Sequence, residues 1–213
     1  MQAKTVKIGL IDYGRGNLRS VEKALQTLGA DVRRVACAEE LVGFDSIVLP
    51  GVGAFGDAMN NLSERGLAAP VLDWLKSGKP FLGICLGYQL LFEESEESPG
   101  VAGLGWIRGK VRRFPDSVGK VPHMGWNEVR PVNEGKELFQ ELPEKSYFYH
   151  VHSYYPEPED KGLAACMTDY GISFASGISM GNLAAFQFHP EKSQSNGLRL
   201  MGNFLKRIQT VHR

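Results

Sequence analysis

The sequence predicts an α/β fold: a mostly parallel sheet with helices on both faces and an antiparallel extension in its second half. Over the first half of the chain, short apolar strands alternate with helical segments, as in the βαβ units that build parallel sheets. After Gly105 the pattern changes to short strands separated by turns, which indicates antiparallel pairing. The chain has no internal repeat or long linker, so we expect residues 1–213 to form a single domain.

The predicted elements follow from local patterns. The segment after Asn17 is an amphipathic helix because its apolar residues recur at helical spacing, and Gly29 supplies its stop. The next long helical segment is interrupted near Gly66 and Pro70. Strands are expected at 6–12, 46–49, 81–84 and 183–188, and helices at 17–28, 57–76, 86–94 and 196–211.

The stretch at 170–190 carries no charged side chain and is long enough to span a bilayer. Glycines and polar side chains interrupt it, however, and period-two pairs such as Ile172 and Phe174 indicate paired strands. Gly181-Asn182 is a typical turn between such strands. We therefore reject a membrane-spanning segment here.

Charge and cysteine usage narrow the class of protein. Lys+Arg and Asp+Glu number 24 each, and zero net charge argues against broad binding to nucleic acid or an anionic membrane. Cys37, Cys85 and Cys166 contain no CxxC pair, which excludes a disulfide framework or a zinc ribbon. We expect no export signal, because the apolar run after Lys7 is short and ends at Asp12. These features predict a reduced, cytoplasmic protein.

The most informative segment is Gly83-Ile84-Cys85-Leu86-Gly87. It places a thiol between two glycines at a predicted strand-to-helix junction, the form of a nucleophile elbow, whose sharp turn leaves no room for neighbouring side chains. The N-terminus of the following helix favours thiolate over thiol. A buried cysteine between packing glycines remains the alternative from this segment alone.

Two further segments can complete such a site. His189 and Glu191 stand two residues apart after a predicted strand, so the carboxylate can orient the imidazole towards a nucleophile. A surface His-Pro-Glu turn is the alternative. The Pro-Gly-Val-Gly run at 50–53 ends another predicted strand, and its N–H groups, with that of Leu86, can stabilise an oxyanion. A tight strand-to-helix connection would need the same glycines.

Other motifs indicate neither a cofactor nor a metal. The glycine-rich loop at 12–17 lacks the third glycine of the dinucleotide fingerprint. His150 and His152 share one face of a predicted strand and His123 lies in another segment, but no carboxylate or thiol stands at ligand spacing. Alternating basic residues at 108–113 predict a strand with one solvated face. We expect no cofactor and no metal.

Taken together, these segments resemble the class I (triad) glutamine amidotransferase family. The resemblance rests on the elbow with Tyr88 and Gln89, and on the Phe-His-Pro-Glu-Lys-Ser run at 188–193. Blocks at 11–17, 50–55, 123–127 and 152–154 are similar to the branch of glutaminase subunits that serves imidazole glycerol phosphate synthesis. The matches span residues 6 to 204. Tyr88 stands where methionine is typical, and His150 where an aromatic or apolar residue is typical.

The resemblance implies a flavodoxin-like sheet and hydrolysis of glutamine. By similarity, Cys85 attacks the side-chain carboxamide, His189 protonates the departing ammonia and Glu191 orients His189. The γ-glutamyl thioester then hydrolyses to glutamate. The backbone N–H groups of Val52 and Leu86 would hold the oxyanion. The residues implied to bind glutamine are Gly51, Gly53, Gln89, Glu97, Ser153 and Tyr154.

The resemblance also implies a protein partner, a (β/α)8-barrel cyclase subunit in a heterodimer. That subunit receives the ammonia and forms imidazole glycerol phosphate and an aminoimidazole carboxamide ribonucleotide in histidine biosynthesis. The implied interface residues are Asp12, Asn17, Trp126 and Lys192. By hypothesis, the loop at 50–53 forms the oxyanion hole only in the complex.

Three alternatives remain open at this stage. One is a sister amidotransferase that serves a purine, pyrimidine, tryptophan/folate or pyridoxal pathway. Another is a flavodoxin-like binding or regulatory module in which Cys85 is inert. The third is a cysteine peptidase or other thiol hydrolase without selectivity for glutamine.

Overall fold

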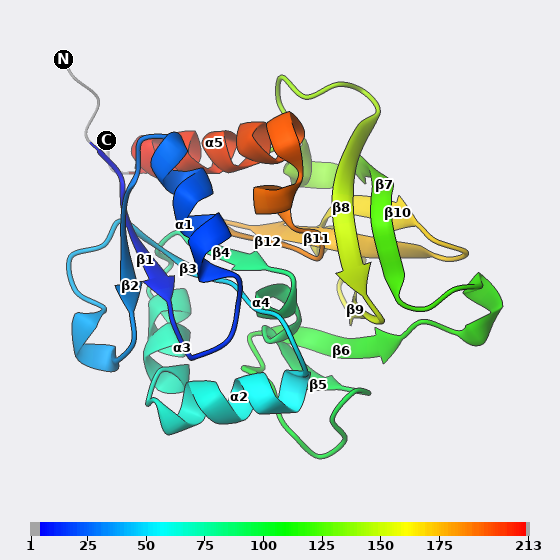
Figure 1. Cartoon of the computed structure of the whole chain (residues 1–213), viewed down its shortest axis with the longest axis horizontal. Coiled ribbons are helices and arrows are strands. Elements are labelled where there is room, and N and C mark those ends of the chain that lie inside the picture. Colours follow the sequence, from blue (N-terminus) through cyan, green and yellow to red (C-terminus); the bar gives the residue numbers. More distant parts are fainter. Residues whose placement is uncertain (1–4, 212–213) are drawn as a thin grey trace.

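The fold is built around one large sheet. A computed structural model describes residues 5–211, and its nine-stranded sheet has the order β2-β1-β3-β4-β12-β11-β10-β7-β8 (Figure 1). The five strands from β2 to β12 pair in parallel, and the remaining four continue the sheet in antiparallel fashion. The predicted fold class is confirmed. The strands are β1 (Lys7–Ile11), β2 (Asp31–Val35), β3 (Ser46–Leu49), β4 (Phe81–Ile84), β7 (His123–Pro131), β8 (Ser146–His152), β10 (Ala164–Asp169), β11 (Ser173–Met180) and β12 (Leu183–Phe186).

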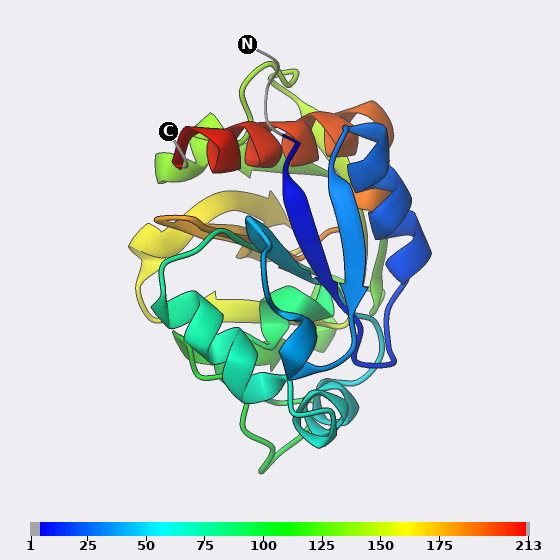
Figure 2. The same cartoon turned by 90° about the vertical axis from the view of Figure 1, so that its left-hand side faces the viewer.

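Helices cover both faces of this sheet. Figures 1 and 2 show α1 (Leu18–Thr27) and α5 (Gln194–Val211) on one side, and α2 (Phe55–Glu64) and α3 (Ala68–Lys76) on the other. Two apolar cores result, one beneath α1 and α5 and one against α2 and α3. Short 3-10 segments lie at Ala38–Glu40, Asp116–Val118, Asn133–Glu137, Lys161–Leu163 and Pro190–Lys192.

The parallel half determines where a site can form. β4 lies between β3 and β12, with Leu49 beside Gly83 and Ile84 beside Phe186. Because parallel strands end at the same edge of the sheet, the segments that follow these three strands meet there. Those segments are the loop at 50–53, the elbow and the His-Pro-Glu run.

The helix predicted at 86–94 is wrong beyond its first turn. The chain forms only α4 (Leu86–Gln89), and Phe92–Ser95 is instead strand β5 in a small sheet with β6 (Ile107–Arg113) and β9 (Tyr154–Pro158). The carbonyls of Leu90 and Leu91 accept hydrogen bonds from the N–H groups of Leu104 and Ile107. Tertiary pairing with a distant segment therefore overrides the local helical pattern.

Other predicted boundaries are shifted. The segment at 57–76 is two helices separated at residues 65–67, but Pro70 lies in the first turn of α3, where its missing N–H costs nothing. Gly181-Asn182 is the predicted turn, between β11 and β12. Strand β2 was not predicted from the sequence; its Arg33 and Arg34 are exposed. Within residues 5–211, no helix is long and apolar enough to cross a membrane.

Candidate active site

Cys85 lies on a strained turn at the carboxyl end of β4. Its φ of 55° is in the left-handed region, which side chains rarely adopt and which is often found at functional sites. The strain is held in place by a hydrogen bond from its N–H to the carbonyl of Phe186, at 2.8 Å. The flanking glycines are needed: a Cβ on Gly87 would overlap the carbonyl oxygen of Leu49, and one on Gly83 would lie 3.0 Å from the Ala185 side chain. The elbow geometry is therefore present.

His189 and Glu191 form a buried pair beside the elbow. Nδ1 of His189 lies 2.8 Å from Oε1 of Glu191, and the two side chains are only 2% and 1% exposed. Burial lowers the pKa of His189, but the sulfur of Cys85 and the carboxylate of Glu191 outweigh it and raise the pKa to about 10. The ring is therefore held as an imidazolium when Cys85 is a thiolate.

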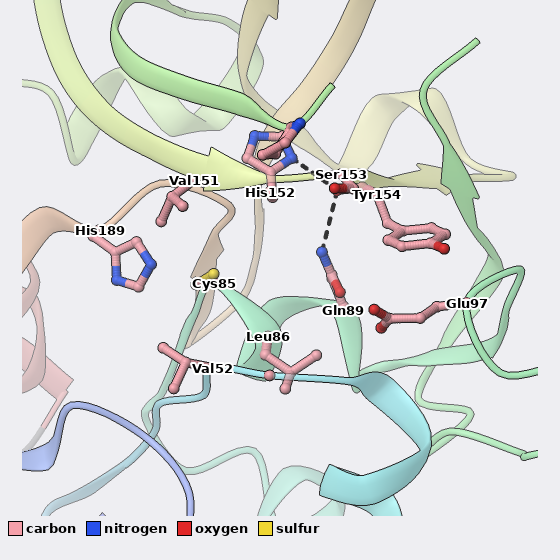
Figure 3. Close-up of a pocket in the computed structure, with 12 residues that line it drawn as sticks. Val52, Cys85, Leu86, Gln89, Glu97, Val151, His152, Ser153, Tyr154 and His189 are labelled. Carbon is pink, nitrogen blue, oxygen red and sulfur yellow. Dashed lines mark hydrogen bonds between the residues drawn. The ribbon is translucent and has the colours of Figure 1, made fainter. Parts of the chain in front are cut away.

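The other nitrogen of His189 is available for chemistry. Nε2 is buried and has no hydrogen-bond partner among the described residues, and Figure 3 shows the ring on the Cys85 side of the pocket. The Cys85 sulfur raises the pKa of this ring, chiefly through its charge. A substrate atom between them would have a nucleophile on one side and a proton donor on the other.

A serine that sequence analysis missed fixes the position of His189. The Ser193 hydroxyl donates to the carbonyl of His189 at 2.6 Å and accepts from the N–H of Tyr149 at 3.0 Å. The N–H of His189 in turn donates to the carbonyl of Tyr149 at 2.9 Å. These bonds tie the histidine segment to β8. Ser193 is the last residue of the Phe-His-Pro-Glu-Lys-Ser run, and its position in that motif could have identified it as a residue of the site.

Gln187 is a second residue that the sequence analysis did not assign to the site. It is fully buried, and its Nε2 lies 3.8 Å from the Cys85 sulfur. Its Oε1 accepts a hydrogen bond from Nε2 of Gln89 at 3.0 Å. Gln187 is a lone polar side chain in the apolar run around β12, and this could have identified it as a residue of the site. Gln187 links the nucleophile to a predicted glutamine-binding residue.

A pocket of about 400 Å³ opens in front of these groups (Figure 3). It brings together most of the predicted catalytic, oxyanion and glutamine-binding residues. Glu191, which contacts His189, does not line the pocket, and neither does Gly51. Neither do the four predicted interface residues. The lining residues are Val52, Gly53, Cys85, Leu86, Gln89, Glu97, Pro122, Val151, His152, Ser153, Tyr154 and His189.

Gln89 and Glu97 are positioned by backbone groups. Gln89 Nε2 donates to the carbonyl of Tyr154 at 3.2 Å as well as to Gln187. Glu97 Oε2 accepts from the N–H of Phe55 at 2.7 Å, so this carboxylate caps the N-terminus of α2. The pocket wall opposite His189 therefore offers a carboxylate and a backbone carbonyl, which are acceptors for an ammonium group. Tyr88, by contrast, lies outside the pocket, and its hydroxyl donates to the carbonyl of Ala175 at 3.3 Å.

The loop at 50–53 blocks one of the expected oxyanion donors. The N–H of Leu86 donates to the carbonyl of Gly51 at 3.4 Å, so this donor is occupied. Val52 is 37% exposed and Gly53 has φ +101°. An oxyanion could use the Leu86 N–H only after the Gly51 carbonyl moves away.

Three buried histidines, His123, His150 and His152, lie close together beside the pocket. The sequence spacing does not indicate that His123 joins the other two. Nε2 of His152 lies 3.2 Å from Nδ1 of His123 and 3.1 Å from Nδ1 of His150. Nδ1 of His152 faces the carbonyl of Tyr154 at 2.8 Å and must carry the proton, so its Nε2 is an acceptor. Asn127 donates to Nε2 of His123 at 3.2 Å. The three rings therefore form a buried polar cluster centred on His152, which lines the pocket.

The same geometry explains why this cluster does not resemble a metal centre. Suitable nitrogens of the three rings lie within 4.8 Å of one another. Nδ1 of His123 and Nδ1 of His150, however, both already lie at hydrogen-bond distance from Nε2 of His152, so a metal ion would have to displace these contacts. The Asn127 hydrogen bond also places the proton of His123 on the nitrogen that faces His152. The absence of a metal remains a prediction.

Acidification is expected to destabilise the fold through this cluster. Burial lowers the pKa of His123 to about 4, and burial followed by the charge of His123 lowers that of His152 to about 3. In an unfolded chain both would titrate near 6.5. As the pH falls below 6.5, the unfolded state binds these protons before the folded state does. The contribution of the two histidines to the free energy of unfolding is therefore fully present above pH 6.5 and is lost as the pH falls towards 4. Each group contributes a slope of about 1.4 kcal/mol per pH unit.

Urea unfolding at pH 7, 6 and 5 measures this slope. Burial and the neighbouring histidines also lower the pKa of His150, so His150→Phe should make the pH dependence shallower. Glu157→Gln, at an exposed ion pair with Arg112, is the control and should leave the slope unchanged. A slope that is identical in wild type and His150→Phe would contradict this account of the cluster.

The four predicted interface residues do not line the pocket. Asp12 accepts from the N–H of Gly14 at 3.0 Å and Asn17 precedes α1. Trp126 is 47% exposed on β7, and Lys192 ends the 3-10 segment after His189. The structure holds no partner chain, so their role remains a prediction.

Comparisons with known proteins identify similar chains. Residues 9–208 match the family described as Glutamine amidotransferase class-I. The imidazole glycerol phosphate synthase subunit HisH of Desulfitobacterium hafniense (strain DSM 10664 / DCB-2) is 50% identical over 199 residues, covering 93% of each chain. The same-named subunit of Aquifex aeolicus (strain VF5) is 48% identical over 208 residues, covering 95% of this chain and 97% of that one.

Solved structures share the fold at lower identity. The structure of PurLQS from Thermotoga maritima has a TM-score of 0.76 at 18% identity, covering 96% of this chain and 99% of that chain. A crystal structure of a glutamine amidotransferase has a TM-score of 0.74 at 21% identity, covering 94% and 98%. At these identities the likeness concerns the fold alone.

Proposed function

The chain belongs to the class I glutamine amidotransferase family, and we propose that it hydrolyses glutamine through Cys85, His189 and Glu191 and delivers the ammonia to a cyclase. The observation that carries the proposal is the buried His189–Glu191 pair, whose free Nε2 lies beside a strained, glycine-flanked cysteine. A packing cysteine would need none of these features. A binding module does not require an imidazolium beside a cysteine thiolate.

The reaction follows from the positions of these groups. The Cys85 thiolate attacks the carboxamide carbon of glutamine, and the carbonyl oxygen becomes an oxyanion. His189 gives its Nε2 proton to the nitrogen, the C–N bond breaks, and ammonia leaves. The neutral histidine then takes a proton from water, which attacks the thioester, releases glutamate and restores the thiolate. Glu191 keeps Nδ1 protonated throughout, so that Nε2 exchanges the proton.

Glutamine would lie across the pocket with its carboxamide at Cys85. Glu97 and the Tyr154 carbonyl would then accept from the α-ammonium group, and backbone N–H groups at Ser153 and Tyr154 would donate to the α-carboxylate. Gln89 holds this wall in place through its bonds to Tyr154 and Gln187. Selectivity for glutamine arises because a substrate without these two charged groups would leave the polar wall unpaired.

The loop at 50–53 would regulate the reaction. Rotation of the Gly51–Val52 peptide would remove the Gly51 carbonyl from the Leu86 N–H and turn the Val52 N–H inward, so that both N–H groups can hold the oxyanion. Removing one such donor typically costs 10²–10³ in rate. A loop that opens only with the partner bound would limit wasteful hydrolysis of glutamine.

The proposed partner is a cyclase with a (β/α)8 barrel that forms imidazole glycerol phosphate and an aminoimidazole carboxamide ribonucleotide in histidine biosynthesis. Relatives that are 48–50% identical over nearly their whole length are named as subunits of imidazole glycerol phosphate synthase. The surface of β7 and β8 supports a protein partner, because Met124, Trp126 and Tyr147 are between 46% and 60% exposed there. Asp12, Asn17 and Lys192 would complete the interface.

Labelling with an electrophilic glutamine analogue tests the catalytic assignment. Incubation with a diazo-ketone analogue of glutamine, followed by peptide mapping, should find the label on Cys85, and excess glutamine should protect it. Cys37 is partly exposed and serves as the internal control. Labelling of Cys37 in preference to Cys85 would favour an inert binding module. Labelling of Cys85 without protection by glutamine would favour a thiol hydrolase of another specificity.

A further inference from the structure

The hydroxyl of Tyr13 is a buried group that the proposed mechanism does not use. Tyr13 follows β1, is fully buried, and its Oη has no hydrogen-bond partner among the described residues. Buried tyrosine hydroxyls usually have one; that of Tyr88 donates to the Ala175 carbonyl. A buried donor without a partner can form a hydrogen bond with an acceptor that moves into its reach.

This hydroxyl lies against the first glycine of the loop at 50–53. A Cβ on Gly51 would be 2.5 Å from Tyr13 Oη and 2.7 Å from the Leu86 side chain. Oη therefore sits between the loop and the elbow. Burial, and next the charge of the Cys85 sulfur, raise the pKa of Tyr13, so the hydroxyl keeps its proton and is a permanent donor.

The chain between β1 and α1 connects this position with the protein surface. The position of a Cβ on Gly16 is 3.8 Å from Pro50 and 3.9 Å from Gly51, so this segment packs directly on the loop. Tyr13 is flanked by Asp12 and followed by Asn17, two of the proposed partner contacts. A shift of the segment on docking would reach the loop through Tyr13 and Gly16.

Rearrangement of the loop would create a need for such a donor. In the observed state the Gly51 carbonyl accepts from the Leu86 N–H. If it leaves that N–H, a buried carbonyl is without a partner unless a new donor replaces the old one. Tyr13 Oη stands beside it with its own bonding capacity unused.

We propose that Tyr13 is a positioning residue whose hydroxyl donates to the Gly51 carbonyl when the loop rearranges, and so stabilises the state that exposes the oxyanion donors. The inference rests on the proposed glutaminase function. Tyr13 touches no reacting atom; it acts by setting the population of the competent loop.

Tyr13→Phe tests this with two independent readouts. In glutamine hydrolysis with the cyclase present, kcat should fall about tenfold while KM changes less than twofold, because the loop acts on the transition state and not on glutamine binding. The melting temperature should not fall, since the observed state loses no hydrogen bond. By NMR, the amide of Leu86 should exchange more slowly in the variant, because its bond to Gly51 opens less often.

Tyr88→Phe is the matched control, since it removes a buried hydroxyl that already has a partner. It should lower the melting temperature and leave kcat within twofold of wild type. A kcat within twofold of wild type for Tyr13→Phe, a change in KM alone, or unchanged exchange at Leu86 would overturn the inference. Failure of the wild-type chain to hydrolyse glutamine with the cyclase present would count against the proposed function instead, and amide exchange would still decide the role of Tyr13.

Discussion

Replacing Cys85 with alanine is expected to reduce glutamine hydrolysis by a factor of about 10³ or more, because no other group in the pocket can form the thioester. Glu97, Ser153 and Tyr154 would still bind glutamine in the variant, so the loss should appear in kcat. The measurement is glutamate release by the purified variant with the cyclase present, since an active loop state is needed to see the full effect.

Cys166→Ala is the control for this substitution. Cys166 is also free and fully buried, and burial raises its pKa to about 12, so it remains a thiol. It packs in the core beneath α1 and α5 and does not line the pocket. The control should lose some stability and keep kcat. Retention of most glutaminase activity by Cys85→Ala would contradict the mechanism.

Gly87→Ala is expected to have the largest effect on the fold. The new Cβ would overlap the carbonyl oxygen of Leu49. Because the Cβ is fixed by the backbone of residue 87 and the oxygen belongs to the backbone of Leu49, no side-chain rotation can relieve the overlap. β4 would have to separate from β3 at the elbow, at a cost of about 4 kcal/mol or more. Urea unfolding should show this loss, and the surviving folded fraction should be inactive because Cys85 is displaced.

A glycine in an open position provides the matched comparison. Gly202 lies within α5, and a Cβ there meets only a Leu28 methyl at 3.7 Å. Gly202→Ala should therefore stabilise the protein by about 0.5–1 kcal/mol through helix propensity. If Gly87→Ala were as stable as wild type, the close approach at the elbow would not exist as described.

The parts of the site that rest on strand adjacency could be predicted from the sequence. Gly-rich or catalytic residues follow three apolar strands, and parallel strands end at one sheet edge, so the elbow, the histidine and the loop at 50–53 were expected to meet. The motif of each segment also indicates its chemical role: a nucleophile in the elbow, a histidine with its carboxylate, and backbone N–H donors in the loop. The order of these strands, with β12 returning beside β4 after a long excursion, has no local signal; only the resemblance implied it.

The parts that depend on distant backbone partners could not be predicted. Strand β5 replaces a helical pattern because residues 103–107 take up the carbonyls that a helix would have used. The bond between Leu86 and Gly51 is invisible in a pattern of glycines. The unpartnered hydroxyl of Tyr13 and the gathering of His123 with the β8 histidines arise from tertiary packing. Local sequence patterns predict individual helices and strands, whereas these four features are contacts between helices, strands and loops that are distant in the sequence.

In the proposed function, glutamine hydrolysis by this chain is coupled to a cyclase. The most direct test mixes the purified chain, one at a time, with the cyclase of histidine biosynthesis and with synthase subunits of purine, pyrimidine, tryptophan/folate and pyridoxal pathways, and measures glutamate release. Only the cyclase should raise kcat, by at least about tenfold, and when its phosphoribulosyl-formimino ribonucleotide substrate is supplied, imidazole glycerol phosphate should form in step with glutamate. Equal or greater stimulation by another synthase subunit, or none by the cyclase, would contradict the account.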